Sequence, residues 1–221
     1  MWAIVPIKTF DRAKQRLAKV LSDDERRSLM LAMARDVITS LSRSSHLTGI
    51  LIVSRAAEAD ALAQAFATER FAESPGGSLA DALDQATHHL IANFAAEGVF
   101  VVPADVPGIE TSEVDSLISQ NDSITILPDT DHIGTNGLIC SPPLAMPYVF
   151  DGKSFKPHVD GAFERGITPI VVPGSSFALD VDTPSDLRQM YAESPESQTG
   201  IYLTKSGIAS RLANLARNIS G

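Results

Sequence analysis

Residues 99–107 read VFVVPADVP, a short apolar run that ends in an aspartate, Asp105, held between two prolines. Runs of the same kind recur along the chain, as AIVPI from Ala3, GILIVS from Gly49, SITILP from Ser123 and PIVVP from Pro169. Continuous apolar strands that alternate with helical patterns are typical of a mainly parallel sheet covered on both faces. The sequence therefore predicts an α/β fold of three layers around a mostly parallel mixed sheet.

The longest helical pattern covers residues 24–41, where Leu29, Met33, Val37 and Leu41 recur every four residues. Ser22 and Glu25, three positions apart, predict a capping box at its start. Further helices are predicted over residues 56–67, 78–95, 112–119, 184–192 and 208–218.

The size and composition favour one globular domain. A chain of 221 residues with 44% hydrophobic and 20% charged residues has enough apolar material for one substantial core. We expect this domain to cover residues 1–193 and residues 194–221 to form a linker and a C-terminal helical extension. The linker is predicted from ESPESQTG at residues 193–200. Ile208, Leu212 and Leu215 fall on one face of the terminal helix, which must pack on the domain or on a second subunit of a homodimer.

The charge balance bears on location and partners. Eighteen Lys and Arg against 27 Asp and Glu give a formal charge of −9, which argues against nucleic acid or an anionic membrane as partner. The first residues lack the apolar run of a signal peptide, and no stretch reaches the ~20 apolar residues of a membrane span. We expect a cytoplasmic protein. The single cysteine, Cys140, excludes an internal disulfide and lies in an apolar run typical of a buried thiol.

Three cations follow the first predicted strand. Lys8 comes directly after Val5-Pro6-Ile7, and Lys14 and Arg16 belong to the next segment, AKQRL. In an acidic protein such a cluster suggests a triphosphate site, where the cations would neutralise the phosphates and a leaving pyrophosphate. A solvated basic loop is the alternative.

Acidic side chains end two predicted strands. Asp105 is placed to bind a metal ion, and the alternative is a turn or N-cap role. Magnesium prefers one or two carboxylates together with phosphate oxygens and water. Asp180 and Asp182 lie in ALDVDTPSDL, where a strand would point both to one face and a cation would relieve their repulsion. Asp182 could equally cap the helix that starts at Thr183-Pro184, whose capping box Asp186 would close, and Asp180 is then the stronger metal candidate of the two.

Glycine-rich loops supply hydroxyl groups and backbone amides. Residues 131–137 contain Gly134 and Thr135, and residues 150–158 contain Gly152 and Ser154. Both mixtures suit a bound phosphate or carboxylate. Gly77 and Ser78, in the loop 75–78, would let a nucleotide approach the backbone closely, or would form a simple turn into a helix.

In order, the segments VPIK, AKxRL, a helix starting SxxE, VPADVP, GTNGL, FxGxSFxxH and LDVDTPxDL resemble those of the CofC-type guanylyltransferases of deazaflavin coenzyme F(420) biosynthesis. The resemblance covers residues 3–187. It implies a Rossmann-like, glycosyltransferase-A-type nucleotidyltransferase fold. It also implies transfer of GMP from GTP to 2-phospholactate, phosphoenolpyruvate or 3-phosphoglycerate. Further implied partners are Mg²⁺ and a downstream transferase that accepts the unstable product.

The resemblance also implies residue roles. Asp105, Asp180 and Asp182 would hold the metal ion. The catalytic set would be Lys8, Lys14, Arg16 and Asp105, and the nucleotide site would comprise Pro6, Lys8, Lys14, Arg16, Gly77, Ser78 and Asp105. The acceptor site would comprise Gly134, Thr135, Gly152 and Ser154.

Two positions depart from the family pattern. Relatives usually carry a Leu-Asn pair where this chain has Leu79-Ala80-Asp81, and often a glycine where it has Asp151. The first departure bears on guanine specificity. The rival functions are a nucleotidyltransferase of the same fold acting on a sugar phosphate or molybdopterin, and a noncatalytic nucleotide-binding protein. Nucleotidyltransferases that act on a sugar phosphate or molybdopterin usually have a glycine-rich loop after the first strand, whereas this chain has Pro6-Ile7-Lys8-Thr9 there.

Overall fold

The computed structural model describes residues 1–8 and 14–219, with the backbone alone for residues 215–219. Its strands are β1 (Trp2–Pro6), β2 (Gly49–Ser54), β3 (Glu69–Ala72), β4 (Val99–Val101), β5 (Ile124–Pro128), β6 (Thr135–Cys140) and β7 (Ile170–Val171). Its helices are α1 (Asp23–Ser42), α2 (Glu58–Phe66), α3 (Leu79–Phe94), α4 (Thr111–Gln120), α5 (Phe155–Phe163), α6 (Pro184–Glu193), α7 (Gln198–Lys205) and α8 (Ile208–Ile219).

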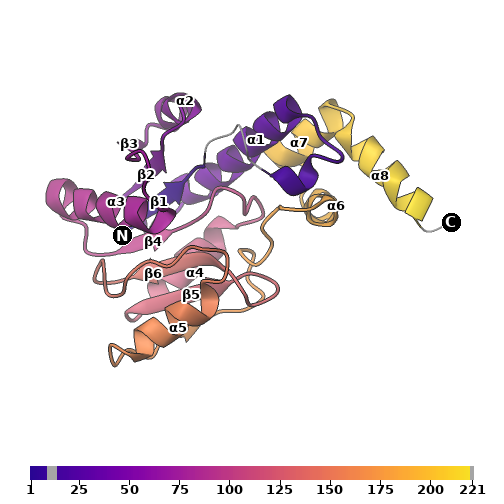
Figure 1. The fold of residues 1–221 in the computed structure, drawn as a ribbon. Helices are drawn as coiled ribbons and strands as arrows, with labels where there is room; N and C mark the ends of the chain where they lie inside the picture. Colours follow the sequence, from indigo (N-terminus) through magenta and orange to yellow (C-terminus); the bar gives the residue numbers. More distant parts are fainter. Residues whose placement is uncertain (9–13, 220–221) are drawn as a thin grey trace.

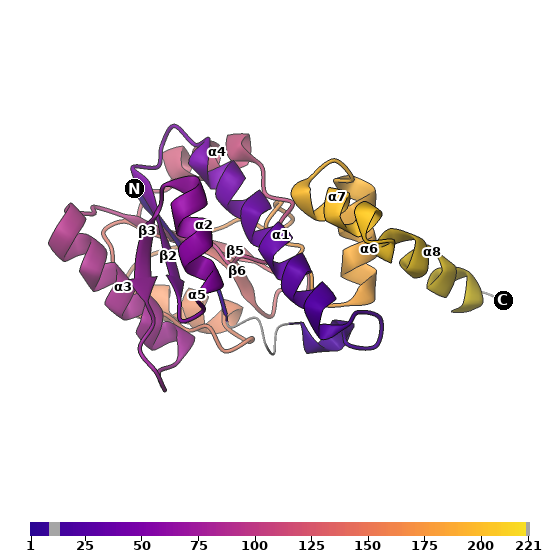
Figure 2. The ribbon, with the colours of Figure 1, turned by 90° about the horizontal axis from the view of Figure 1, so that it is seen from above.

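The strands form one mixed sheet in the order β3-β2-β1-β4-β6-β5-β7. Strand β6 runs antiparallel to its neighbours β4 and β5, and the other pairs are parallel. Helices lie on both sides of the sheet (Figures 1 and 2). The predicted three-layer α/β fold is confirmed.

Alternate residues of each central strand enter different cores. In β1, Ala3 and Val5 pack with α1 and α2, whereas Trp2 and Ile4 pack with α3. The second core also contains Cys140, whose thiol is buried as expected and whose pKa burial raises to about 12. Two buried layers hold the central strands rigidly, so the loops at their ends start from fixed positions.

Helix starts follow their sequence signals. Ser22 caps α1 through the predicted capping box with Glu25, and Ser78 does the same for α3 with Asp81. Thr183 caps α6 with Asp186, and Pro184 occupies the first turn, where its missing N–H is not needed. Asp182 is therefore not the N-cap of this helix.

Two segments that the sequence presented as loops are regular elements. Helix α5 begins inside the predicted loop 150–158, because Pro157 falls in the first turn, where a proline interrupts no hydrogen bond. Strand β6 begins at Thr135, within the predicted loop 131–137. There Gly137 packs against Leu127 so closely that a Cβ would collide with it, so this glycine serves the sheet.

The predicted strand at residues 178–182 is absent from the described sheet. Val181 N donates to Asp105 O and Ala178 O accepts from Thr130 N, each at 3.0 Å, so isolated backbone bonds hold this segment in place of a ladder. The strand predicted from Pro169 shrinks to the two exposed residues of β7 at the sheet edge. Pro169 and Pro173 flank it and cannot donate to a ladder.

The predicted linker is wrong in its second half, because α7 begins at Gln198. Asp36 of α1 accepts hydrogen bonds from Gln198 N, Thr199 N and Thr199 Oγ1, at 2.8, 2.8 and 2.6 Å. Gly200 packs against the Pro195 backbone, where any Cβ would collide. The C-terminal segment is therefore anchored on the first helix.

Helix α8 extends away from the sheet (Figures 1 and 2). Ile208 and Leu212 are buried within this chain, whereas the side chain of Leu215 lies outside the described residues. A homodimer, the alternative to packing on the domain, stays a prediction. Over the described residues, no helix combines the length and apolar character needed to span a bilayer.

Candidate active site

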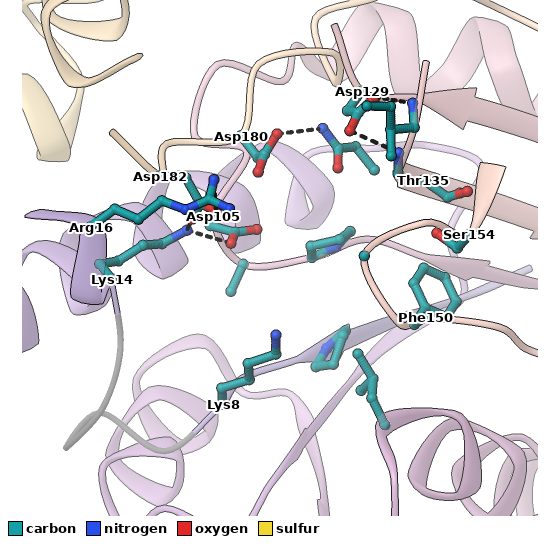
Figure 3. Close-up of a pocket in the computed structure, with 18 of the residues that line it drawn as sticks. Lys8, Lys14, Arg16, Asp105, Asp129, Thr135, Phe150, Ser154, Asp180 and Asp182 are labelled. Atoms are coloured by element: carbon teal, nitrogen blue, oxygen red, sulfur yellow. Dashed lines mark hydrogen bonds and ion pairs between the residues drawn. The ribbon is translucent and has the colours of Figure 1, made fainter. Parts of the chain in front are cut away.

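A cavity of about 670 Å³ lies at the carboxyl ends of β1, β4 and β5, beside the start of β6 (Figure 3). Ligands of open α/β sheets bind at this edge. The cavity is lined by eleven of the predicted site residues, namely Pro6, Lys8, Lys14, Arg16, Asp105, Gly134, Thr135, Gly152, Ser154, Asp180 and Asp182. The fold therefore gathers residues from the whole length of the chain in one place.

Lys14 is the centre of the charged cluster. Its Nζ lies 2.6 Å from Asp105 Oδ2 and 2.6 Å from Asp182 Oδ1, and only 5% of its side chain is exposed (Figure 3). Its backbone is left-handed, with φ 53° and ψ 47°, a conformation that costs a non-glycine residue ~1 kcal/mol. The Lys14 ammonium is therefore shared by two of the acids that were predicted to bind a metal ion.

The charges in this cluster support one another. Burial on its own would lower the pKa of Lys14, but the two carboxylates outweigh burial and raise it. Burial would raise the pKa of Asp105, and Lys14, with a smaller contribution from Lys8, outweighs it and lowers the pKa. Both groups are thus held in their charged forms.

The carboxylate of Asp180 lies in a partly buried place beside two other carboxylates. Burial, together with the nearby negative charge of Asp105 and Asp182, raises its pKa, against a hydrogen bond from Asn136 and the charge of Lys14. Asn136 Nδ2 lies 3.1 Å from Asp180 Oδ1 and also donates to the carbonyls of Phe177 and Ala178. The amide thereby fixes the extended segment that carries Asp180.

The two other predicted cations are more open to solvent. Arg16 NH1 lies 3.7 Å from Asp182 Oδ2, but 74% of its side chain is exposed. Lys8 follows the end of β1 and lines the cavity apart from the ion pairs of Lys14, below them in the view of Figure 3. These exposed side chains are free to contact a ligand that enters the cavity.

The loop before β6 is closed by an acid that the sequence did not single out. Asp129 accepts hydrogen bonds from Ile133 N and Gly134 N, both at 2.8 Å. The Gly134 amide, expected to contact a ligand, is therefore already paired. The Thr135 hydroxyl lies one residue further along the cavity wall and 2.9 Å from Nδ1 of the buried His158.

The second predicted loop leads into a helix start. Ser154 is 2% exposed and takes the N-cap position of α5, yet its side chain makes no capping hydrogen bond. Gly152 has φ +86°, which a residue with a Cβ rarely adopts. Ser154 thus lines the cavity with a hydroxyl that is not used as a helix cap.

Gly77 and Ser78 are not brought to this cavity. Ser78 caps α3, and its hydroxyl and amide are taken up by Asp81. Leu79, the next residue, does line the cavity, so the tip of α3 forms part of its wall. The prediction of a nucleotide contact at Gly77 and Ser78 therefore stays a prediction.

Three polar residues at the site were missed. Asn136 lies in the quoted segment GTNGL and Asp129 directly follows a predicted strand, so both had a positional signal. His158 ended the segment FxGxSFxxH but was not placed in the predicted acceptor site. Phe150 adds an apolar wall to the cavity (Figure 3).

The described side chains do not form a complete metal site by themselves. Within residues 1–8 and 14–219, no group of three or more His, Cys, Asp or Glu side chains could hold a metal ion. Asp105 and Asp182 nevertheless converge on one cation, the ammonium of Lys14. Two carboxylates match the small protein donor set that magnesium uses alongside phosphate oxygens.

Sequence comparison gives a family for the chain. Residues 1–218 match the protein family described as Guanylyl transferase CofC like. A phosphoenolpyruvate guanylyltransferase of Sphaerobacter thermophilus is 31% identical over 87% of this chain and 93% of the relative. A 2-phospho-L-lactate guanylyltransferase of Methanobrevibacter ruminantium is 32% identical over 94% of this chain and 92% of the relative.

Solved structures share the fold. A putative nucleotide-diphospho-sugar transferase from Desulfovibrio desulfuricans superposes with a TM-score of 0.77 at 19% identity, covering 96% of both chains. A nucleotidyl transferase from Methanothermobacter gives a TM-score of 0.59 at 14% identity, covering 86% of this chain and 94% of that one. At these identities the likeness supports the nucleotidyltransferase fold and no particular substrate.

Proposed function

This chain belongs to the CofC-like guanylyl transferase family, and we propose that it transfers GMP from GTP to the phosphate of a small phosphorylated hydroxy acid, with release of pyrophosphate. The acceptors to test are phosphoenolpyruvate, 2-phospholactate and 3-phosphoglycerate. The first two are the substrates named in its relatives. The proposed product belongs to coenzyme F(420) biosynthesis, where a downstream transferase would consume it.

One observation carries the proposal. A single cavity combines three cations, Lys8, Lys14 and Arg16, with the carboxylates of Asp105, Asp180 and Asp182. A triphosphate needs positive charge for its phosphates and, with magnesium, one or two carboxylates. The cavity also falls within the ~300–1,000 Å³ typical of small-molecule sites. A merely structural ion-pair network would not need an open cavity around it.

The reaction is a displacement at the α-phosphorus of GTP. An oxygen of the acceptor phosphate forms the new bond, and the bond between the α-phosphorus and the β-bridging oxygen breaks. Phosphate is largely ionised near pH 7, so no side chain has to remove a proton. The protein's part is to align the reactants and neutralise the charge on the leaving pyrophosphate.

The basic residues have distinct parts in this reaction. Lys14 would exchange its carboxylate partners for phosphate oxygens, a change that its convergent position between Asp105 and Asp182 allows. Lys8 and Arg16 would reach the triphosphate from the more exposed rim. Each fixed cation stabilises developing negative charge most in a site that excludes water.

The acidic residues fit a divalent cation. Asp105 and Asp182 would hold Mg²⁺ where Lys14 now shares their oxygens, with Asp180 beside them. Burial and, after it, the neighbouring carboxylates raise the pKa of Asp180, which supports this assignment, because a second positive charge would offset the repulsion between the carboxylates. When bound, the ion would supply charge neutralisation for the phosphate oxygens.

The acceptor is proposed to bind at the opposite wall. Thr135 and Ser154 supply hydroxyl groups from two elements, and both are largely buried, at 5% and 2% exposure. Both side chains are small hydrogen-bond donors and neither carries a negative charge. They therefore suit an acceptor acid that carries a phosphate and a carboxylate.

The test is to measure pyrophosphate release by the purified full chain. GTP, ATP and CTP are each combined with the three acids, with Mg²⁺ or with a chelator. We expect release with GTP, at least one acid and Mg²⁺. Release without any acid, or with a sugar phosphate in place of the acids, would favour a rival function.

A binding measurement separates catalysis from nucleotide sensing. Titration calorimetry with GTP and Mg²⁺ but no acceptor should show binding without turnover. Binding accompanied by no pyrophosphate release with any of the three acids would favour the noncatalytic reading.

A further inference from the structure

His158 is completely buried and has a partner on each ring nitrogen. Its Nδ1 lies 2.9 Å from Thr135 Oγ1, and its Nε2 lies 3.1 Å from the backbone nitrogen of Val149. The side chain thus comes from the first half of α5 and reaches both the start of β6 and the loop before Phe150. It connects the two segments that carry the proposed acceptor contacts.

The partners fix which nitrogen of the ring holds the proton. A backbone N–H is always a donor, so Nε2 opposite Val149 must be the acceptor and carry no proton. Burial lowers the pKa of His158 to about 4, against a smaller opposing effect of Asp151, so the ring is neutral near pH 7. The single proton therefore sits on Nδ1 and is donated to Thr135 Oγ1.

This arrangement leaves the proton of the Thr135 hydroxyl pointing elsewhere. A hydroxyl has one proton to donate and can accept two hydrogen bonds. Because its oxygen accepts from His158, its proton is available on the side of the cavity that Thr135 lines. Phosphate and carboxylate oxygens accept hydrogen bonds, so a hydroxyl held as a donor matches them.

We propose that His158 is a positioning residue that keeps the Thr135 hydroxyl as a hydrogen-bond donor toward an anionic group of the acceptor acid. The inference rests on the proposed function, since it assumes that the acid binds beside Thr135. His158 also holds Val149, next to Phe150, and its ring meets the Phe150 ring edge-on at 5.1 Å between centroids. The same imidazole therefore contacts Thr135 and Phe150, which both line the cavity, and holds them at a fixed separation.

Two substitutions separate the contacts of the ring. The side-chain amide of His158→Asn can place a donor near the position of Nδ1 but falls short of Val149. The side-chain amide of His158→Gln can place an acceptor near the position of Nε2, opposite Val149 N. It leaves the Thr135 hydroxyl without the donor that Nδ1 supplies in the wild type. We expect His158→Gln to raise the KM of the acid about tenfold or more, with kcat and the KM of GTP close to wild type, and His158→Asn to restore most of the acid affinity.

A double-mutant cycle tests whether His158 acts through Thr135. In a Thr135→Val background, His158→Gln should cause little further loss in kcat/KM for the acid. Full, additive losses would overturn the proposal, because they would mean that His158 supports the fold independently of the hydroxyl. An unchanged acid KM in His158→Gln would overturn it as well.

A measurement on the unmodified protein does not depend on whether the variants fold. Nitrogen NMR of protein labelled at histidine reports which ring nitrogen is protonated. We expect His158 to carry its proton on Nδ1 at pH 7, and a proton on Nε2 or on both nitrogens would overturn the inference. Failure of the proposed function looks different, because the wild-type chain would then release no pyrophosphate with any of the acids.

Discussion

Lys14 and Asp105, 91 positions apart in the sequence, form an ion pair of 2.6 Å at the base of the cavity. The lysine side chain is almost fully buried, and its second partner, Asp182, is 168 positions away. The pair joins the segment after β1 to the segment after β4. A change on either side should therefore be felt in both charge balance and activity.

Replacing Asp105 by asparagine should abolish turnover while leaving the fold intact. The change keeps the shape of the side chain but removes one of two negative charges that face Lys14. We expect kcat/KM for pyrophosphate release to fall on the order of 100-fold or more. The matched control is Asp122→Asn, an exposed residue outside the cavity, which should behave as wild type. Near-normal activity of Asp105→Asn with Mg²⁺ would remove Asp105 from the proposed metal site.

Replacing Lys8 by alanine should lower turnover more than acceptor binding. Its ammonium lines the cavity near the proposed triphosphate position, so its loss removes charge stabilisation from the leaving group. Steady-state kinetics with GTP and acid varied separately give the comparison, and the exposed Lys19→Ala is the control. If only the KM of the acid rises, Lys8 belongs to the acceptor half of the site.

Thr135→Val and Ser154→Ala should each weaken the acid and leave GTP binding nearly unchanged. Removing a hydroxyl that bonds a charged group costs on the order of 1.5–3 kcal/mol, roughly a ten- to hundredfold loss of affinity. Calorimetric titration of each ligand against each variant measures this. Equal weakening of GTP would move that residue to the nucleotide half, and no weakening at all would make it structural.

The buried His158 should make stability depend on pH. Its pKa in the folded chain is about 4, against 6.5 ordinarily, because burial disfavours the charged ring. As the pH falls below 6.5, the unfolded imidazole takes up a proton while the folded one does not, so unfolding becomes easier until the pH reaches about 4. This group should cost about 2–3 kcal/mol between pH 7 and pH 4.5.

Denaturant unfolding of wild type and His158→Gln across this range isolates that contribution, since the remaining acids titrate in both proteins. We expect the stability difference between the two to shrink as the pH falls. A difference independent of pH would mean that the folded imidazole titrates normally.

Asp36→Ala should loosen the C-terminal helices. The substitution leaves two backbone amides at the start of α7 and the Thr199 hydroxyl without their acceptor in a buried place. We expect a loss of about 2–4 kcal/mol in the free energy of unfolding. Asp24→Ala, exposed on the same helix, should change it by less than about 1 kcal/mol. Equal effects of the two substitutions would show that Asp36 does not anchor α7.

Local signals in the sequence were enough for much of the fold. The apolar runs around Ile4, Leu51 and Phe100 identified the central strands, and the capping pair of Ser22 and Glu25 located the longest helix. These features succeed because they depend on neighbours a few residues apart. The same local rules failed for α5, where glycine and hydroxyl residues in the stretch 150–158 suggested a loop although a helix begins at Phe155.

The sequence by itself determined the alternation of strands and helices, and with it the edge of the sheet where Lys8 and Asp105 had to lie. Only the tertiary structure decided the partners of each group. It placed Lys14 between two acids, gave the Gly134 amide to Asp129, and set His158 behind Thr135. The physical reason is that side-chain hydrogen bonds and ion pairs depend on ångström distances between segments far apart in the chain, which periodicity and local propensity do not encode.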